Sequence, residues 1–204
     1  MTFRFCDESA DGFGWIVADE GMRRCSHALR VEGRVWVIDP VAWPEAEERI
    51  RLLGEPAGVV QLLDRHNRDC AEVAERLGVP HLLLPDVLPP FEVVRSVDGP
   101  GWHERALWWP EGRVLAAADA LGTAGYFLAR GERLAVHPIL RLFPPRRLAR
   151  FEPDSVLLGH GEGVHDDATG ALHEALRTAR RRLPSWVASR LLGRKLHESL
   201  EARG

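Results

Sequence analysis

Four side chains that can ligate a metal ion follow apolar runs of the sequence: Asp69, Cys70, Asp119 and His160. Apolar runs of this length predict buried strands, and loops at the carboxyl ends of strands are where α/β sheets build their sites. Three of them, Asp69, Asp119 and His160, follow separate predicted strands, and carboxylates, thiolates and imidazoles are the side chains that ligate transition metals. One hypothesis is therefore a metal site made of residues that lie far apart in the sequence.

The residues that precede the first ligand pair favour a different interpretation. Arg65 and Asn67 come just before Asp69 in the stretch LLDRHNRDCAEVAERLGVP, and a permanently charged guanidinium does not ligate a metal. If Arg65 pairs with Asp69 or Asp119, it takes the place of a cation and leaves a metal-free binding cleft. Cys70 is then a small buried residue and Asp69 the cap of a helix. The sequence leaves both interpretations open.

Composition fits one folded domain with a helical appendage. The chain has 204 residues, of which 45% are hydrophobic, and a formal net charge of -3, so there is no global attraction to nucleic acid or anionic membranes. The 3 cysteines show no short-range pairing pattern, and the first residues lack the pattern of a signal peptide. We therefore expect free thiols in a reducing cytoplasm. No uncharged apolar run approaches the roughly 18 residues that span a bilayer.

The first half of the chain predicts a parallel crossover that positions the first two candidate ligands. The apolar runs Val35–Ile38 and Gly58–Leu63 are typical of strands that are buried on both faces. Ala71–Leu77 has helical composition, Gly78 ends it, and His81–Leu84 predicts another strand. A strand, a helix and a second strand in this order form a βαβ unit, which implies a locally parallel sheet with helices packed on it.

The second half adds two strands and a helical tail. Gly112–Gly122 predicts a strand that ends at Asp119, and Ser155–Leu158 predicts another, which is followed by His160 between two glycines. Glycine lets the backbone turn sharply there and bring the imidazole near another group. The arginine-rich tail is expected to be helical, with Pro184 at the start of a second helix.

Together these segments resemble the metallo-β-lactamase fold superfamily, from about Phe13 to about Leu176. The resemblance rests on four motifs, in this order: GRVWVIDP, RHNRDCAEVAERLGVP, DGPGWHERALWWPEGRVLAAADAL and ARFEPDSVLLGHGEGV. They are similar to the family's strand ending in aspartate, its His-x-His-x-Asp-His loop and helix, its Pro-Gly-His segment with the strand of the bridging aspartate, and its Gly-His-Gly turn. The resemblance implies a four-layer αββα sandwich over residues 1–176, with residues 177–204 as a basic helical extension.

Residue by residue, the family motif is only partly present. Asp69, Asp119 and His160 match its motif aspartate, its bridging aspartate and its last histidine. The family's other ligand positions hold residues that are not histidine: Arg65, Asn67, Cys70 and Trp102. Because Arg, Asn and Trp do not replace imidazole ligands, the first metal position is lost. The resemblance leaves the second position, with one zinc or iron ion on Asp69, Cys70, Asp119 and His160, and with the two aspartates acting in catalysis.

The implied activity is hydrolysis of an ester, thioester or amide with at most one metal ion. The alternative is a non-catalytic protein of this fold that binds a small ligand or a protein partner. In either case we expect five residues to line the pocket: Arg65, His66, Asn67, Trp102 and His103. A third and weaker interpretation has the late arginines contacting nucleic acid, but no aromatic platform is interleaved with them.

Overall fold

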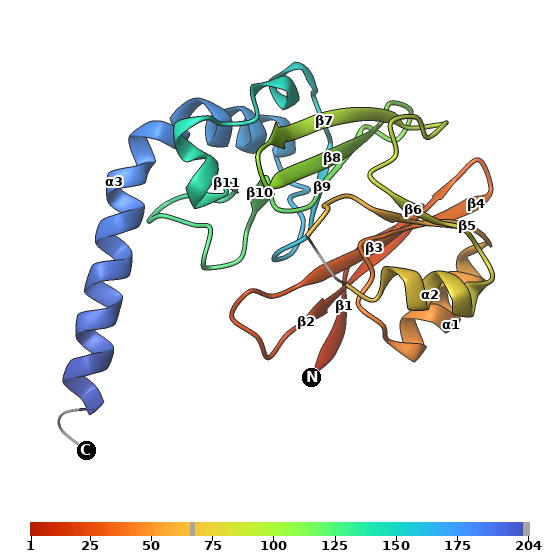
Figure 1. The fold of residues 1–204 in the computed structure, drawn as a ribbon, viewed down its shortest axis with the longest axis horizontal. Coiled ribbons are helices and arrows are strands. Elements are labelled where there is room, and N and C mark those ends of the chain that lie inside the picture. Colours follow the sequence, from red (N-terminus) through yellow and green to blue (C-terminus); the bar gives the residue numbers. More distant parts are fainter. Residues whose placement is uncertain (66–67, 202–204) are drawn as a thin grey trace.

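The computed structural model describes residues 1–65 and 68–201, which form two packed sheets flanked by helices (Figure 1). In this part of the chain the first sheet has six strands in chain order: β1 (Phe3–Ser9), β2 (Gly12–Val17), β3 (Cys25–Val31), β4 (Arg34–Ile38), β5 (Glu55–Gln61) and β6 (His81–Leu83). The strands β1 to β4 are antiparallel neighbours, whereas β4, β5 and β6 run parallel. The parallel crossovers contain the helices α1 (Pro44–Leu53) and α2 (Cys70–Leu77), as the βαβ pattern predicts.

The second sheet carries the strands that precede Asp119 and His160. Within the described residues it has four strands, in the order β12 (Ser155–Leu158), β9 (Val114–Ala117), β8 (Trp102–Trp109) and β7 (Glu92–Gly99). The strands β7 and β8 form a hairpin, and β12 lies parallel to β9. Because parallel neighbours end at the same edge of a sheet, the segments after β9 and β12 emerge side by side. A short pair, β10 (Leu121–Gly122) and β11 (Ala135–Val136), follows in the chain after β9.

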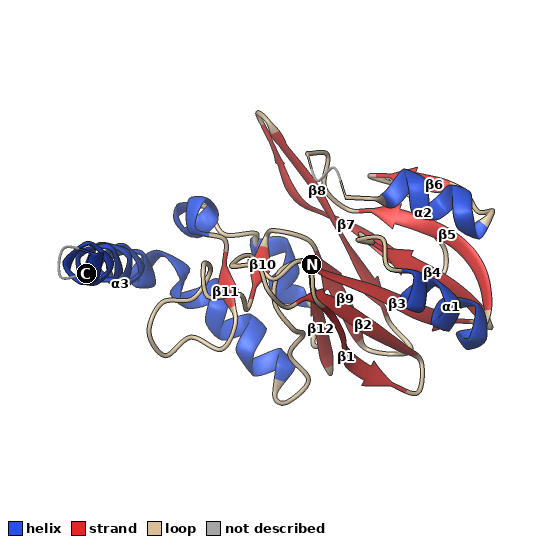
Figure 2. Ribbon diagram, turned by 90° about the horizontal axis from the view of Figure 1, so that it is seen from below, coloured by secondary structure: helices blue, strands red, loops and turns tan. Residues whose placement is uncertain are grey.

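Alternating side chains divide the core into layers. In β4, Val37 packs with α1 and α2, while Ile38 belongs to the apolar layer between the sheets. In β12, Leu157 joins the layer between the sheets, and Leu158 packs against the helix α3 (Ala168–Glu201). This period of two follows from the pleat of a strand. The order of helix, sheet, sheet and helix (Figure 2) confirms the predicted four-layer sandwich.

The ends of the crossover helices follow their sequence signals. Pro44 is at the first turn of α1, where its missing amide proton costs nothing. Gly78 ends α2 with φ 69°, in the left-handed region that favours glycine. Between β11 and β12 the chain forms two 3-10 helices, Pro138–Leu142 and Arg146–Arg150. The crossover that carries Asp69 is therefore placed as the sequence predicts.

The tail differs from the prediction, because α3 is one helix with Pro184 inside it. Proline removes one backbone donor and crowds the preceding turn, which bends a helix that neighbouring contacts hold together. The helix changes direction, and its far half projects from the body (Figure 1). Residues of α3 are buried as far as Ala179, so the helix continues past residue 176, where the sequence predicts the start of the extension. The division of the chain at residue 176 stays a prediction. None of the helices in the described residues is both long and apolar enough to cross a membrane.

Candidate functional site

Asp119 and His160 lie together where the chain leaves β9 and β12. The strand β9 ends at Ala117, so Asp119 lies in the loop just beyond it, and His160 has the same place after Leu158. The distance between Asp119 Oδ1 and His160 Nε2 is 3.0 Å, and the side chains are 13% and 5% exposed. The structure therefore brings together two of the four predicted ligands.

The imidazole of His160 is oriented by the backbone. Its Nδ1 is 2.9 Å from the carbonyl oxygen of Met22 and donates its proton there, so Nε2 faces Asp119. Because an unprotonated Nε2 and a carboxylate oxygen are both acceptors, their 3.0 Å separation requires a proton or a cation between them. The flanking glycines are needed, because a Cβ at Gly159 would lie 2.9 Å from a carbonyl oxygen and Gly161 has φ 85°.

Asp69 and Cys70 have other surroundings. The Ala42 amide donates a hydrogen bond to Asp69 Oδ2 at 2.8 Å. Cys70 belongs to the buried apolar layer under α1 and α2, and burial, with the charge of Asp39, raises the pKa of its thiol well above its usual range. The Cys70 thiol therefore lies where a small apolar side chain fits. The full set of four ligands stays a prediction. The structure brings together two of its members, Asp119 and His160.

A buried guanidinium lies among the strand ends, and it belongs to Arg68. Its Nη1 donates to the carbonyls of Cys25 and Asp39, the second at 3.0 Å, and its Nη2 donates to the carbonyl of Gly159 at 2.5 Å. Arg68 is 8% exposed, and these hydrogen bonds join β3, β4 and the loop after β12. Nothing in the sequence pattern distinguishes Arg68 from the other arginines, because its three partners come from distant segments.

Arg65, which one interpretation pairs with an aspartate, contacts the β7–β8 hairpin instead. Its Nη1 donates to the carbonyl of Gly101 at 2.9 Å, and its guanidinium carbon lies 4.0 Å from the centre of the Trp102 ring. Trp102 is buried in the layer between the sheets. The next residue, His103, is exposed and lies 2.7 Å from Asp98 on the same hairpin. Adjacent residues of a strand face opposite sides, so Trp102 and His103 do not share one pocket wall.

Glu104 is a buried carboxyl group that supports Asp119, and the sequence pattern does not single it out. It is 0% exposed and accepts hydrogen bonds from the amides of Ala120 and Asp119, at 2.9 and 3.2 Å, and from the indole of Trp102 at 3.2 Å. Burial, with the charge of Asp119, raises the pKa of Glu104 to about 8. The group is therefore mostly protonated at neutral pH and holds the backbone that presents Asp119.

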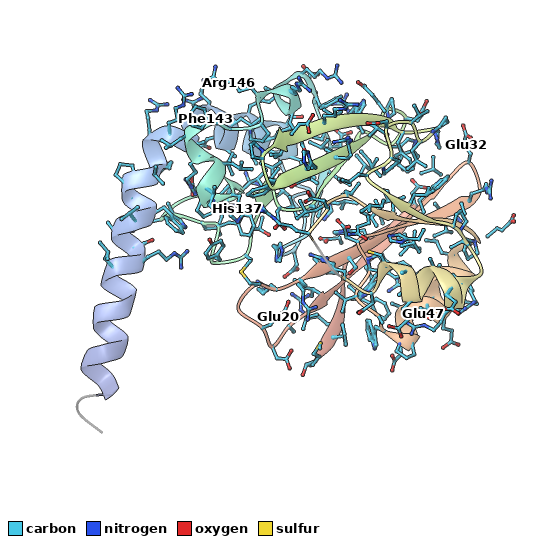
Figure 3. All side chains as sticks on the ribbon, in the orientation of Figure 1. Glu20, Glu32, Glu47, His137, Phe143 and Arg146 are labelled. Atoms are coloured by element: carbon cyan, nitrogen blue, oxygen red, sulfur yellow. The ribbon has the colours of Figure 1, made fainter. Side chains whose placement is uncertain are left out.

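A row of aromatic rings connects this region to α3. The ring of His137, labelled in Figure 3, lies 4.9 Å from that of Trp102 and 5.7 Å from that of Tyr126. Tyr126 in turn lies 5.9 Å from the ring of Trp186 in α3. Burial lowers the pKa of His137 to about 4, although the charge of Asp119 opposes the shift. His137 is consequently neutral at physiological pH and serves as a packing group.

Several residues at the ligand positions implied by the resemblance have protein partners. Arg65 and Trp102 are in contact with each other, and two further pocket predictions, His66 and Asn67, lie outside the described residues. Beside His160, the guanidinium of Arg68 donates to the carbonyl of Gly159. The predicted metal and pocket residues stay predictions.

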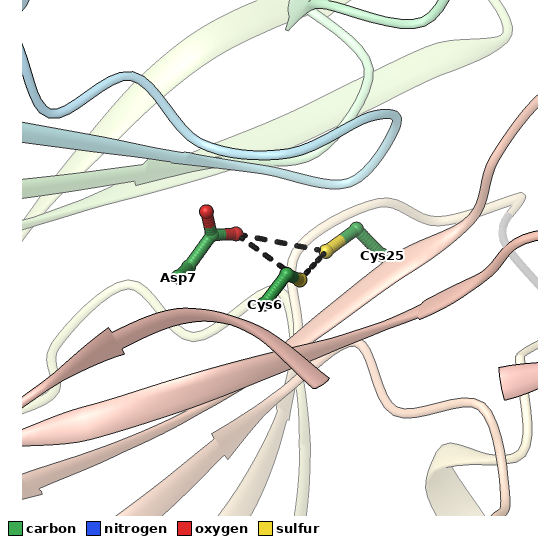
Figure 4. A group of neighbouring side chains, drawn as sticks. All are labelled: Cys6, Asp7 and Cys25. Atoms are coloured by element: carbon green, nitrogen blue, oxygen red, sulfur yellow. Dashed lines mark hydrogen bonds between the residues drawn. The ribbon is translucent and has the colours of Figure 1, made fainter. Parts of the chain in front are cut away.

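Three ligand atoms do converge elsewhere in residues 1–65 and 68–201, namely those of Cys6, Asp7 and Cys25 (Figure 4). The sulfur atoms are 3.6 Å apart, and Asp7 Oδ2 lies 3.5 Å from one and 3.9 Å from the other. His27 Nε2 is 3.6 Å from Cys25 Sγ. The sequence does contain one signal for this cluster, because Cys25 and His27 are two apart in a strand and share a face. The structure thus contains a possible metal-ligand cluster that the motif does not indicate.

The chain is similar to solved structures of metallo-β-lactamases. The DIM-1 metallo-beta-lactamase matches with a TM-score of 0.60 at 14% identity, over 88% of this chain and 99% of that chain. A metallo-beta-lactamase from Pontibacter korlensis matches with a TM-score of 0.59 at 14% identity, over 86% of this chain and 99% of that chain. No family model and no curated protein matches the sequence. The chain therefore has the metallo-β-lactamase fold, which confirms the resemblance at the level of the fold.

Proposed function

We propose that this chain is a non-catalytic protein of the metallo-hydrolase fold, which binds a small ligand at Asp119 and His160 without a metal ion. The observation that carries the proposal is the guanidinium of Arg68, which is buried and donates to three backbone carbonyls at the strand ends. A permanent cation there supplies the positive charge that a metal ion supplies in a metal centre, and it disfavours a second cation.

The pair of Asp119 and His160 suits recognition of a polar ligand. Asp119 is 13% exposed, and its amide is held by Glu104, while Met22 fixes the ring of His160. Polar groups that are held in place before binding orient a ligand at low entropic cost. The fitting ligand is a small molecule with an N–H or O–H donor for the carboxylate.

A second candidate function is hydrolysis of an ester, thioester or amide with one zinc or iron ion. The observation that favours it is again the pair, because a histidine that donates one ring proton to a carbonyl and turns its other nitrogen to a carboxylate is arranged like a metal ligand. In this candidate Asp69, Cys70, Asp119 and His160 hold the ion, and the two aspartates act in catalysis. It requires Asp69 and Cys70 to leave their present partners.

Hydrolysis assays separate the two candidates. Chromogenic ester, thioester and amide substrates are offered to the purified protein with and without added Zn²⁺ or Fe²⁺. The first candidate predicts background rates throughout, equal for the wild type and Asp119→Ala. Metal-dependent turnover that disappears in Asp119→Ala would establish the second candidate and refute the first.

Ligand binding is tested by thermal-shift screening with a fragment library of small amines, amides and alcohols. Fragments that raise the Tm of the wild type are expected to lose their effect on Asp119→Ala. The matched control is Asp98→Ala, because Asp98 also lies within hydrogen-bond distance of a histidine, at 2.7 Å, but on the exposed hairpin. Fragments that stabilise Asp119→Ala as well as the wild type would contradict binding at the pair, as would a screen in which no fragment raises the Tm.

A further inference from the structure

The cluster built across β1, β2 and β3 has no part in the proposed function. We propose that Cys6, Asp7, Cys25 and His27 form a structural zinc site. The four side chains are all buried, with exposed fractions of 6% or less. The proposal is independent of ligand binding at Asp119, and each of the two can fail alone.

The distances within the cluster fit a tetrahedral ion. Bonds of about 2.3 Å to sulfur and 2.0 Å to oxygen give tetrahedral edges of about 3.8 Å between two sulfurs and about 3.5 Å between sulfur and oxygen. The corresponding distances are 3.6 Å between Cys6 Sγ and Cys25 Sγ, and 3.5 and 3.9 Å from these atoms to Asp7 Oδ2. These three atoms therefore form one face of a zinc tetrahedron with little rearrangement.

His27 supplies the fourth ligand. Its Nε2 lies 3.6 Å from Cys25 Sγ and 3.1 Å from Asp7 Oδ2, close to the edges of about 3.6 Å to sulfur and about 3.3 Å to oxygen that a zinc tetrahedron requires. The edge to Cys6 Sγ is longer, because the ligand atom of His27 does not lie within 4.8 Å of all three other ligand atoms. Entry of the ion replaces the thiol protons and closes this edge by drawing the imidazole toward Cys6. Two thiolates, a carboxylate and an imidazole match the preference of zinc for sulfur and nitrogen ligands.

Gly14 keeps the centre of the cluster open. It lies on β2 in register with Cys6 on one side and His27 on the other. A Cβ at Gly14 would lie 3.1 Å from Cys6 Sγ, 3.2 Å from Asp7 Oδ2 and 3.0 Å from His27 Cδ2. Glycine weakens the interior of a strand and marks places where other groups approach closely. Here the groups that approach are the ligands themselves.

Asp7 is oriented for ligation by two residues that follow β12 of the second sheet, Gly163 and His165. Its Oδ1 accepts hydrogen bonds from the amide of Gly163 and from His165 Nε2, both at 2.9 Å, which leaves Oδ2 facing the sulfurs. A buried carboxylate thus faces two buried thiols, and a divalent cation neutralises such a group.

A disulfide between Cys6 and Cys25 is the competing chemistry, and the sheet opposes it. The strand β2 lies between β1 and β3, so the two backbones are about two strand spacings, roughly 9–10 Å, apart. A disulfide requires Cα atoms within about 7 Å. Sulfur atoms that reach toward each other across Gly14 therefore fit an ion between them better than a covalent bond.

The ion would be structural, because four protein ligands leave no open position for a substrate. It would fasten the edge strand β1 to β3 and, through Asp7, to the segment after β12. His165 is 45% exposed and lines an open cavity of about 580 Å³, together with Arg23, Glu162 and Gly163. Two of these residues, Gly163 and His165, are the ones that donate hydrogen bonds to Asp7.

Cobalt substitution tests the site without any change in the sequence. Protein treated with a chelator and then titrated with Co²⁺ is expected to show a thiolate-to-cobalt charge-transfer band in the near ultraviolet and the visible bands of tetrahedral cobalt. Both are expected to saturate at one equivalent and to disappear when one equivalent of Zn²⁺ is added. Absence of the charge-transfer band at saturating Co²⁺ would overturn the proposal, as would a mass two hydrogens lower, from a disulfide.

The chain offers matched controls for the ligands. Cys6→Ser and Cys25→Ser are each expected to remove most of the charge-transfer intensity and of the zinc in the purified protein. Cys70→Ser changes the third cysteine, which lies in the apolar layer under α2, and is expected to change neither. Asp119→Ala should also keep the zinc. Loss of zinc in Asp119→Ala but not in Cys6→Ser would overturn this site and place the ion at the other pair, whereas loss in Cys6→Ser alone leaves the proposed ligand binding untouched.

Discussion

The surroundings of Asp119 and His160 differ sharply from those of Cys6 and Cys25. Around Asp119 and His160 lie a guanidinium, a mostly protonated carboxyl group and an indole, none of which ligates zinc. Around the two cysteines lie a carboxylate and an imidazole within 3.9 Å of the sulfurs. The family motif points to the first region, and the ligand chemistry gathers in the second.

The difference shows that a ligand set is decided by charge as well as by residue type. Both regions border the same permanent cation, Arg68, but the second also concentrates groups that become negative when a metal binds, the thiols of Cys6 and Cys25. Arg68 lies between them, because it donates to the carbonyls of Cys25 on one side and Gly159 on the other. A substitution of Arg68 is therefore expected to affect both regions, and it gives the strongest test of the comparison between them.

Arg68→Met is expected to have the largest effect. Methionine keeps the apolar stem but leaves the carbonyls of Cys25, Asp39 and Gly159 without their donor. The free energy of unfolding should fall by about 3–5 kcal/mol, as when one partner of a buried charged interaction is removed. Urea denaturation of the two proteins measures this difference. A loss of less than about 1 kcal/mol, the size expected of an exposed pair, would show that the guanidinium does not hold the strand ends.

Glu104→Gln should alter the pH dependence of stability. The pKa of Glu104 is about 8 in the folded protein against an ordinary value of 4.5, so between these values the folded state holds a proton that the unfolded state has lost. Stability therefore falls as pH rises through this window. Denaturation curves from about pH 5 to pH 8 should show a decline of a few kcal/mol for the wild type, and a clearly smaller one for Glu104→Gln. Parallel declines would assign the pH dependence to other groups.

Much of the fold was readable from the sequence, because local rules decide it. Buried apolar runs predicted the parallel strands, and Pro44 and Gly78 marked helix ends that the structure places there. The glycines beside His160 predicted a sharp turn. Pro184 misled the prediction, because contacts of Trp186 and Arg190 with the loop at Tyr126 hold the helix together beyond it.

The sites were less readable, because they depend on which distant segments meet. Arg68 and Glu104 acquire their roles only from burial among other elements. Cys25 and His27 could be seen to share a strand face, but Cys6 joins them across β2, and that requires the strand order of the sheet. The cluster was therefore not predicted from the sequence, although the spacing of Cys25 and His27 carries a signal for one of its strands.

His165→Ala is expected to weaken zinc binding without unfolding the protein. The His165 ring holds Asp7 Oδ1 at 2.9 Å, and removal of such a supporting hydrogen bond typically costs about 10–100-fold in metal affinity. Competition with a coloured chelator measures the affinity. His103→Ala is the matched control, since its ring is also exposed and paired with an aspartate at 2.7 Å, and it should leave the affinity unchanged. Equal effects of the two variants would remove His165 from the zinc site.

Arg65→Met should have the smallest effect. It removes one hydrogen bond, to Gly101, and the contact of a guanidinium with the Trp102 ring. An exposed contact of this kind is worth about 0.5–1 kcal/mol. Urea denaturation should show a loss of that size, well below that of Arg68→Met. A loss as large as that of Arg68→Met would mean that Arg65 is the cation on which the first region depends.

The second half of α3 projects from the body of the molecule (Figure 1). Val187 and Leu191 are 42% and 57% exposed there, yet the same stretch touches the body through Trp186 and Tyr126. A force that displaced the helix would first deprive Tyr126 of a ring neighbour, and the next ring inward belongs to His137. A chain of ring contacts therefore links α3 to Trp102, and Trp102 donates a hydrogen bond to the Glu104 carboxyl group that holds the backbone of Asp119.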